Sequence, residues 1–162
     1  HRKNQSFRDK DQIKLIKKIN NKDIEISEKI YDIFQKSYKI EAKILNVSKF
    51  PPLERSIENI INSDTQFFGF FIKKKIVSII ETENKFQSIH IQSLVVCPNY
   101  FRQGIGKKMI NQIIKDASKN ITVETGLKNH PARSLYEFLG FKKNRIYKAR
   151  YGIKKIRYEL KS

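Results

Sequence analysis

Two glycines in one short turn are the residues best suited to bind an anionic ligand. Gly104 and Gly106 follow an apolar run rich in β-branched residues, Ile89–Val96, and apolar residues at helical spacing come next, so the sequence predicts a strand, a turn and a helix. A glycine lets the backbone approach a ligand, and the first turn of a helix offers unpaired N–H groups at the positive end of its dipole. Phosphate groups bind well at such a place, and Arg102 and Lys107 add positive charge. The predicted ligand is therefore anionic, and a pyrophosphate fits.

The spacing of these glycines argues against two common kinds of phosphate-binding site. It is not G-x-G-x-x-G, and the chain has no G-x-x-x-x-G-K-[S/T] segment, which argues against a Rossmann dinucleotide site and a nucleotide P-loop. Val96-Cys97-Pro98, followed by the residues from Phe101 to Gly106, instead resembles the acyl-CoA-binding motif [Q/R]-x-x-G-x-[G/A] of the GNAT (Gcn5-related N-acetyltransferase) superfamily. Phe101 stands where the superfamily usually has Gln or Arg, and Arg102 and Gln103 follow it.

A second segment resembles the other signature of the same superfamily. From Asn129 to Phe141 the chain reads NHPARSLYEFLGF, which matches N-x-x-A-x-x-L-Y-x-x-x-G-F at every specified position. Two motifs in the right order are far more specific than either alone. A tyrosine beside leucines at helical spacing is usually a packed residue, so a chemical role for Tyr136 follows from the resemblance and not from the spacing.

The resemblance implies that an acetyl group passes from acetyl-CoA to an amine by direct attack, with CoA as the product and no metal. It implies that the backbone of Leu94, Val95 and Val96 pairs with the pantetheine arm and that Tyr136 protonates the leaving sulfur. A phenol with a pKa of about 10 is protonated at neutral pH, as a proton donor must be. The other cofactor-binding residues that the resemblance implies are Arg102, Gln103, Gly104, Ile105, Gly106, Lys107, Asn129 and Arg133.

The base that deprotonates the amine is less constrained. Alignment back from the glycine turn puts His90 where some members of the superfamily carry a glutamate, and a histidine with a pKa of about 6.5 is chemically suitable. The alternative for His90 is a polar residue on the open face of a strand. Glu81, Gln92 or Glu124, acting through water, are the other candidates.

The acceptor amine is expected where the first two helices and a hairpin tip border the cofactor. Tyr38, Glu41 and Phe50 are the candidate contacts, and Glu41 would attract a cationic amine. The alternative for Glu41 is an ordinary solvated helix carboxylate. The sequence does not name the acceptor: lysine side chains, protein N-termini, aminoglycosides, polyamines and small amines all remain.

The elements that must position these residues form a predicted α/β fold, a mixed sheet with helices on both faces in a single domain of residues 1–162. Their expected order is β-α-α-β-β-β-α-β-α-β-β, which is similar to the GNAT fold. The first helix is capped by Asp23 or Ser27 and reaches Tyr38, with an extension to Leu45 left open. The second begins at Pro51 and presents Leu53, Ile57, Ile60 and Ile61 on one face; the predicted strands are 13–19, 66–72, 76–82, 89–96, 121–125 and a closing hairpin that turns near 150–154.

The charge of the 162-residue chain points to anionic partners. Its formal net charge of +18 attracts nucleic acid, ribosomes, anionic membranes or a phosphorylated cofactor. Lys, Ile and Asn are abundant throughout and no nucleic-acid motif accompanies them, so a compositional bias is the preferred explanation; a nucleic-acid-associated module and a non-catalytic acyl-CoA sensor are the alternative functions.

Cysteine usage and hydropathy bear on the compartment. The one cysteine, Cys97, excludes an internal disulfide and fits a cytoplasmic location. No apolar run approaches the roughly 20 residues that a membrane helix needs, so a membrane partner is not expected. A homodimer is left open, because edge strands in such folds often pair between subunits.

Overall fold

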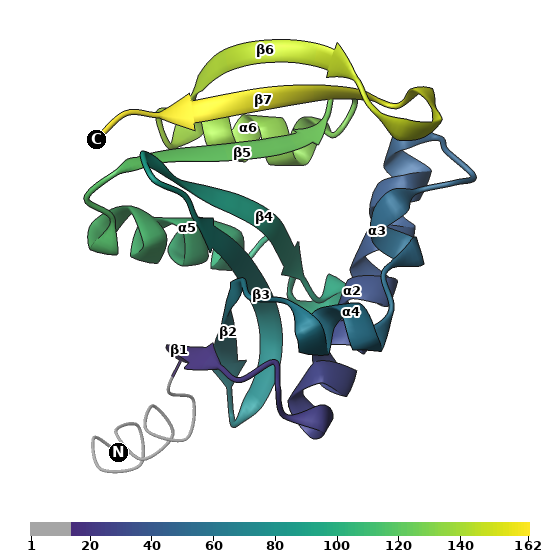
Figure 1. Ribbon diagram of the computed structural model, residues 1–162, viewed down its shortest axis with the longest axis vertical. Coiled ribbons are helices and arrows are strands. Elements are labelled where there is room, and N and C mark those ends of the chain that lie inside the picture. The colour runs from purple at the N-terminus through teal and green to yellow at the C-terminus, as the bar shows by residue number, and fades with distance from the viewer. Residues whose placement is uncertain (1–13) are drawn as a thin grey trace, which may run out of the picture.

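A computed structural model describes residues 14–162 and arranges them around a seven-stranded sheet (Figure 1). The order of the strands is β1-β2-β3-β4-β5-β7-β6, and all neighbours are antiparallel except β4 and β5, which run parallel. The predicted mixed α/β sheet is confirmed. The strands are β1 Lys14–Ile19, β2 Gln66–Ile72, β3 Lys75–Asn84, β4 Ser88–Val96, β5 Asn120–Gly126, β6 Lys142–Lys148 and β7 Lys154–Leu160.

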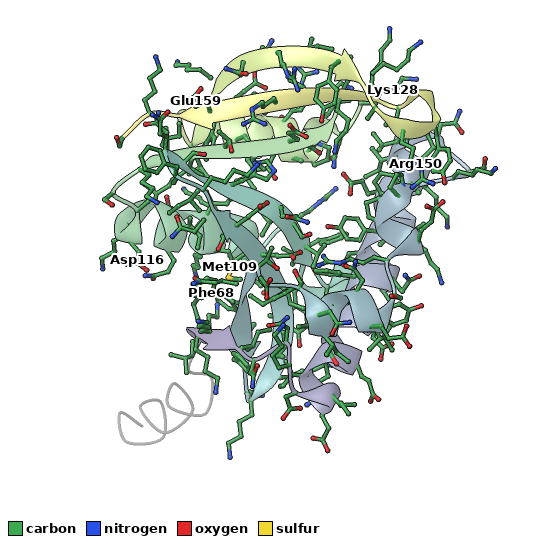
Figure 2. The ribbon with its side chains drawn as sticks, viewed as in Figure 1. Phe68, Met109, Asp116, Lys128, Arg150 and Glu159 are labelled. Carbon is green, nitrogen blue, oxygen red and sulfur yellow. The ribbon has the colours of Figure 1, made fainter. Side chains whose placement is uncertain are left out.

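Helices cover both faces of this sheet and bury two hydrophobic clusters. On one face, Ile30 and Phe34 of α2 pack with Ile60 of α4. On the other face, Met109 of α5 is buried, and the half-buried Phe68 of β2 packs against the same cluster (Figure 2). The helices are α2 Ile24–Leu45, α3 Pro51–Glu54, α4 Ile57–Asn62, α5 Ile105–Asp116 and α6 His130–Phe138, with short 3-10 turns η1 Pro98–Tyr100 and η2 Arg150–Gly152.

The long helix α2 begins and ends at identifiable caps. A side-chain oxygen of Asp23 accepts a hydrogen bond from the Ile26 N–H, so Asp23 and not Ser27 is the N-cap. Asn46, in the left-handed region at φ +55°, ends the helix. The extension of the helix from Tyr38 to Leu45, which the sequence left open, is therefore present, and it carries α2 along the site described below.

The single helix predicted from Pro51 is wrong, because the chain forms two short helices there, α3 and α4. Arg55 has extended backbone angles, which interrupt the helical path after Glu54. The Ser56 side chain then caps α4 by accepting a hydrogen bond from the Asn59 N–H. The break frees the side chain of Arg55 to turn inward, with consequences for the pocket.

Both predicted hairpins are present, with different bounds. Lys73 and Lys74 both have positive φ, as a tight two-residue turn requires, and β3 continues to Asn84. The strands of the closing hairpin are joined through η2, and β7 lies between β5 and β6. Ile13, predicted to begin the first strand, lies outside the described residues.

Candidate active site

The parallel pair β4 and β5 separates halfway along β4. Pairing with β5 covers only Ser88–Ile91, whereas pairing with β3 continues to Val96. The register between β3 and β4 leaves Gln92 as an extra, bulged residue at the point of separation, and a bulge bends the strand that carries it. The two strands diverge in Figure 1. Beyond Gln92, β4 therefore has a backbone edge that no described strand covers.

The polar groups of this edge can be assigned from the neighbouring strand. Cys97 donates its N–H to the Val77 carbonyl of β3, at 2.8 Å, and N–H and C=O groups alternate sides along a strand. The groups of Leu94 and Val96 therefore face away from β3, toward the uncovered edge, where the Val96 carbonyl accepts a hydrogen bond from the Ser37 hydroxyl of α2 at 3.2 Å. Those of Val95 face β3, where its carbonyl accepts a hydrogen bond from Ser78. Three residues were expected to pair with a pantetheine arm. The backbone N–H groups of Leu94 and Val96 face the uncovered edge, and that of Val95 does not.

The glycine turn lies directly beyond the end of this strand. Arg102 and Gly104 have positive φ, of 63° and 73°, and residues 101–104 are exposed. A Cβ added at Gly104 would meet no atom within 4 Å. Gly104 is the N-cap of α5, and the N–H groups of its first turn have no partner within the helix. The turn thus presents open space, exposed donors and the positive end of a helix dipole.

Gly106 and Lys107 have contacts within the protein that the sequence did not predict. A Cβ added at Gly106 would lie 3.4 Å from Leu135 of α6, so this glycine lets α5 lie close to α6. The Lys107 ammonium sits 4.6 Å from the centre of the Phe138 ring, also on α6. Both residues belong to the predicted turn, but they also join the two helices.

Tyr136 is the buried aromatic residue of α6. It is 4% exposed, and its ring packs against those of Phe141 and Tyr158. Burial raises the pKa of Tyr136 above its usual range, and the charges of Glu41 and Tyr38 raise it further. The phenol therefore keeps its proton at neutral pH. Because Glu41 and Tyr38 belong to α2, their effect on Tyr136 shows that α2 lies close to this part of α6.

Asn129 and Glu41 connect α2 to the start of α6. The Asn129 side-chain oxygen caps α6 by accepting a hydrogen bond from the Ala132 N–H, and its amide donates to Glu41 at 2.8 Å. Burial raises the pKa of Glu41, although the hydrogen bonds from Asn129 and Thr125 oppose the rise. Glu41 is thus a half-buried carboxylate, and one of its oxygens accepts the bonds that tie it to the α6 N-cap and to Thr125.

Arg133 and Phe50 are also held within the fold. Arg133 donates to the Tyr158 hydroxyl and to the Leu127 carbonyl, both at 3.0 Å, and so ties α6 to β7. Phe50 is 8% exposed in the α2 cluster, where its ring meets the ring of Tyr38 edge-on. Phe50 therefore packs against Tyr38 and is not among the residues that line the pocket described below.

His90 lies on the half of β4 that pairs with β5. Its Nδ1 is 2.8 Å from the hydroxyl of Thr122, the residue opposite it on β5. Burial lowers the pKa of His90 below its ordinary value, so the ring is neutral at pH 7. The nearby groups whose charges act on His90 are Glu124, Arg157, Lys85 and Glu83. Those that act on Tyr136 are Glu41, Tyr38 and Tyr158, so the two predicted catalytic groups share no charged neighbour.

Glu124 is the organised carboxylate on the same face as His90. It accepts hydrogen bonds from Arg157, at 2.9 Å, and from the Tyr147 hydroxyl, and Lys155 lies 3.8 Å away. Burial alone would raise the pKa of Glu124, but the hydrogen bonds from Tyr147 and Arg157 outweigh it and hold the pKa below its ordinary value. A carboxylate so stabilised is a poor base.

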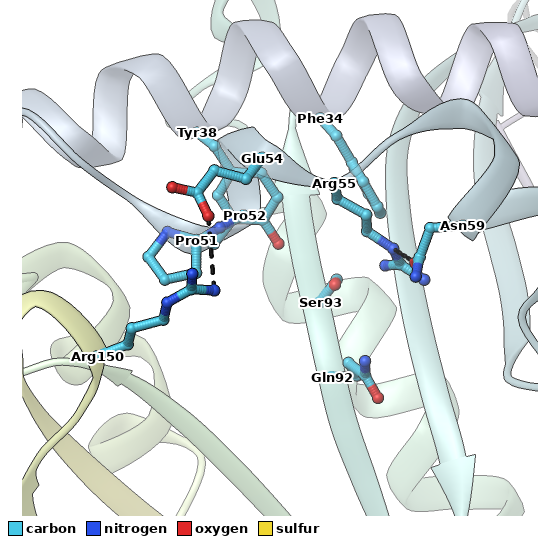
Figure 3. A pocket seen from close by; sticks show the side chains of 10 residues that line it. All are labelled: Phe34, Tyr38, Pro51, Pro52, Glu54, Arg55, Asn59, Gln92, Ser93 and Arg150. Atoms are coloured by element: carbon cyan, nitrogen blue, oxygen red, sulfur yellow. Dashed lines mark hydrogen bonds and ion pairs between the residues drawn. The ribbon is translucent and has the colours of Figure 1, made fainter.

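A pocket of about 430 Å³ opens beside the uncovered part of β4 (Figure 3). Tyr38, predicted from the sequence, lies on its wall. Arg150 of η2 reaches toward Glu54 of α3 across one side, with a nearest nitrogen–oxygen distance of 3.6 Å. The lining residues are Phe34, Tyr38, Pro51, Pro52, Glu54, Arg55, Asn59, Gln92, Ser93 and Arg150.

Behind this pocket lies a buried ion pair. Glu81 is 0% exposed and receives two hydrogen bonds from the Arg55 guanidinium, at 2.6 and 2.9 Å. Sequence reasoning placed Glu81 among the possible bases but missed Arg55. A charged residue directly after the apolar Ile79 and Ile80 was the available signal for a buried pair, and nothing in the sequence identified its partner or Arg150.

Among residues 14–162, no three His, Cys, Asp or Glu side chains gather closely enough to hold a metal ion. In the same part of the chain, no helix combines the length and the apolar character that a membrane span requires.

Comparisons with known proteins bear on this geometry. A sequence profile described as the acetyltransferase (GNAT) domain matches residues 38–162. The UPF0157 protein YqkA of Bacillus subtilis is 32% identical over 142 residues, which amount to 86% of this chain and 41% of YqkA, so the chain spans less than half of that relative.

Solved structures share the fold. The ribosomal-protein-S18-alanine N-acetyltransferase of Escherichia coli is 21% identical, with a TM-score of 0.71 over 92% of this chain and 94% of its own. The PaiA N-acetyltransferase of Thermoplasma acidophilum, solved in complex with coenzyme A, is 20% identical, with a TM-score of 0.72 over 93% of this chain and 99% of its own. At these identities the likeness establishes the arrangement of the elements.

Proposed function

This chain belongs to the GNAT acetyltransferase family, and on that premise we propose that it transfers an acetyl group from acetyl-CoA to an amine. The observation that carries the proposal is the uncovered edge of β4, which ends at the exposed turn around Gly104. An extended amide chain with a pyrophosphate at its end needs both features, a strand edge and a cluster of N–H donors, in this order.

The residues present fit such a ligand. Leu94 and Val96 direct backbone groups to the open edge, where a pantetheine arm would pair as a strand does. Arg102, Gln103 and the first-turn N–H groups of α5 would hold the pyrophosphate, since the turn has exposed donors and no Cβ at Gly104. When bound, acetyl-CoA supplies the thioester carbonyl that the amine attacks.

Tyr136 is our candidate for the general acid. It holds a proton at its hydroxyl oxygen, because burial and the neighbouring Glu41 raise its pKa. The phenol is therefore protonated at neutral pH, as a general acid must be, and it can donate to a sulfur that leaves as a thiolate. Glu41 and Asn129 act indirectly, because their hydrogen bond fixes the N-terminus of the helix that carries Tyr136.

His90 is our candidate for the base. When its Nδ1–H donates to the Thr122 hydroxyl, Nε2 is free to accept a proton from the acceptor ammonium through water. Glu81 is a weaker candidate, since its oxygens are occupied by Arg55, Thr65 and Ser93.

Ligand binding and turnover test the proposal separately. Acetyl-CoA and CoA should raise the unfolding temperature at micromolar concentrations, whereas NAD and ATP should not. Thiol release in the presence of an amine panel then measures transfer. An unfolding temperature that does not respond to either thioester or thiol would overturn the proposal.

Substitution of the proposed acid tests the mechanism. Tyr136→Phe should lower kcat about 100-fold, the usual lower range for a general acid, and leave the affinity for CoA unchanged. Unchanged turnover would show that Tyr136 only fills space between Phe141 and Tyr158.

A further inference from the structure

We propose that the acceptor is an amine that also carries an oxyanion, a carboxylate or a phosphate, and is not a polycation. This inference rests on the proposed acetyltransfer and names the class of acceptor. The pocket next to β4 is its basis, because Gln92 and Ser93 line the pocket and also begin the uncovered stretch of that strand. A molecule in the pocket would therefore lie beside the place expected for the thioester.

The buried carboxylate behind the pocket has no capacity left for a ligand ammonium. Glu81 accepts two hydrogen bonds from Arg55, one from Thr65 at 2.5 Å and one from Ser93 at 2.9 Å. A carboxylate offers about four lone-pair positions, and these four donors fill them. Glu81 thus neutralises Arg55 and does not serve as a cation site.

The acidic residue on the pocket wall is also partnered. One oxygen of Glu54 accepts a hydrogen bond from the Tyr151 hydroxyl, and the other lies 3.6 Å from Arg150. Glu54 is the one acidic residue among those that line the pocket. A polyamine or an aminoglycoside, which needs several carboxylates to balance its ammonium groups, would therefore meet one acidic residue on this wall, and that residue already has two partners.

Hydrogen-bond donors are in excess at the same wall. Arg55 directs its Nε to Asn59, at 2.6 Å, and one N–H from each terminal nitrogen to Glu81. A guanidinium has five N–H donors, so two remain outside these three bonds. The Phe34 and Phe67 rings, each 5.8 Å from the guanidinium carbon, hold it in place.

Arg150 adds a second and more accessible guanidinium. Its side chain is 69% exposed and crosses the pocket edge toward Glu54. Guanidinium groups bind carboxylates and phosphates in a bidentate manner, which is stronger than a contact to a neutral group. The pocket wall therefore offers guanidinium donors, while its carboxylates already have partners. Such a wall favours a ligand with acceptor oxygens.

The charge of the whole chain acts in the same direction. With a net charge of +18, the protein repels polycations at a distance and attracts molecules with an acidic group. An amine with one carboxylate or phosphate carries no net positive charge and escapes this repulsion. Pocket and surface thus favour the same class of acceptor.

Matched acceptors provide the test, with kcat/KM for CoA release as the measurement at constant ionic strength. L-phenylalanine is compared with phenethylamine, and O-phosphoethanolamine with ethanolamine; the two pairs separate a carboxylate from a phosphate preference, and spermidine represents the polycations. We expect the acid-bearing member of at least one pair to be favoured about tenfold or more, the factor of one charge-assisted hydrogen bond. The proposal would be overturned if neither L-phenylalanine nor O-phosphoethanolamine were turned over better than its matched amine, or if spermidine were turned over better than both.

A charge-matched pair of variants shows whether the pocket causes the preference. Arg150→Gln should reduce the ratio about tenfold, whereas Lys143→Gln, which removes the same charge from exposed β6, should leave the ratio unchanged. CoA binding is measured for each protein by calorimetry. If Arg150→Gln binds CoA and keeps the same ratio of kcat/KM between the acid-bearing amine and its matched amine, the proposed acceptor class is contradicted. If the unaltered protein does not bind CoA, the proposed function is contradicted instead.

Discussion

Two glycines with the same φ allow the predicted phosphate turn to be tested against a control within the same protein. Gly104 and Gly152 both have φ of +73°, and a Cβ added at either would meet no atom within 4 Å. Gly104 begins α5, whereas Gly152 ends η2 in the closing hairpin. Replacement by alanine therefore places a Cβ at the same positive φ at both sites, but only Gly104 faces the expected cofactor.

The magnitudes follow from this geometry. A non-glycine residue in the left-handed region costs about 1 kcal/mol, because Cβ approaches the backbone carbonyl. For a chain of this size, Gly104→Ala and Gly152→Ala should each lower the unfolding temperature by roughly 2–4 °C. Loss of one charge-assisted hydrogen bond to a phosphate weakens binding about tenfold or more, so Gly104→Ala alone should lose that much CoA affinity.

Thermal unfolding and isothermal calorimetry with CoA measure the two effects separately. Equal losses of stability, with weaker CoA binding only in Gly104→Ala, would support the assignment of the turn. If both variants bind CoA as the unaltered protein does, Gly104 is required by the turn itself and the phosphate lies elsewhere. If both weaken equally, the loss reflects stability and not contact.

Two further predictions concern the remaining ionisable groups. The value of kcat/KM should rise with pH through the lowered pKa of His90, with a midpoint below 6.5, because the neutral ring is the base. His90→Gln should remove this acidic limb of the pH profile. An identical profile in the variant would exclude His90 as the base. Glu81→Leu should destabilise the protein by about 3–5 kcal/mol, because it leaves the guanidinium of Arg55 buried without its partner. In thermal unfolding, the double variant Glu81→Leu with Arg55→Leu should recover most of that loss. A Glu81→Leu protein as stable as the unaltered one would contradict the buried pair.

Much of the fold could be predicted because its signals are local. Alternating and continuous apolar runs predicted the strands, and Asp23, the N-cap of α2, was one of the two caps expected before the amphipathic stretch. Where the outcome depended on a distant partner, the prediction was wrong or incomplete. The helix expected from Pro51 divides at Arg55, whose guanidinium binds Glu81 on another element.

The sequence by itself determined the family, because its two motifs lie at a glycine turn and at a helix start. The residue types at a turn and at a helix cap are set by local backbone conformation, so they can be recognised without the rest of the fold. Tertiary structure alone decided which groups are free to act. In the folded chain the Val95 backbone faces β3, Glu41 accepts a hydrogen bond from Asn129, and Phe50 packs edge-on against Tyr38. The reason is physical: hydrogen-bond capacity and burial are set by residues far apart in the chain, and they become defined only when the sheet and its helices pack.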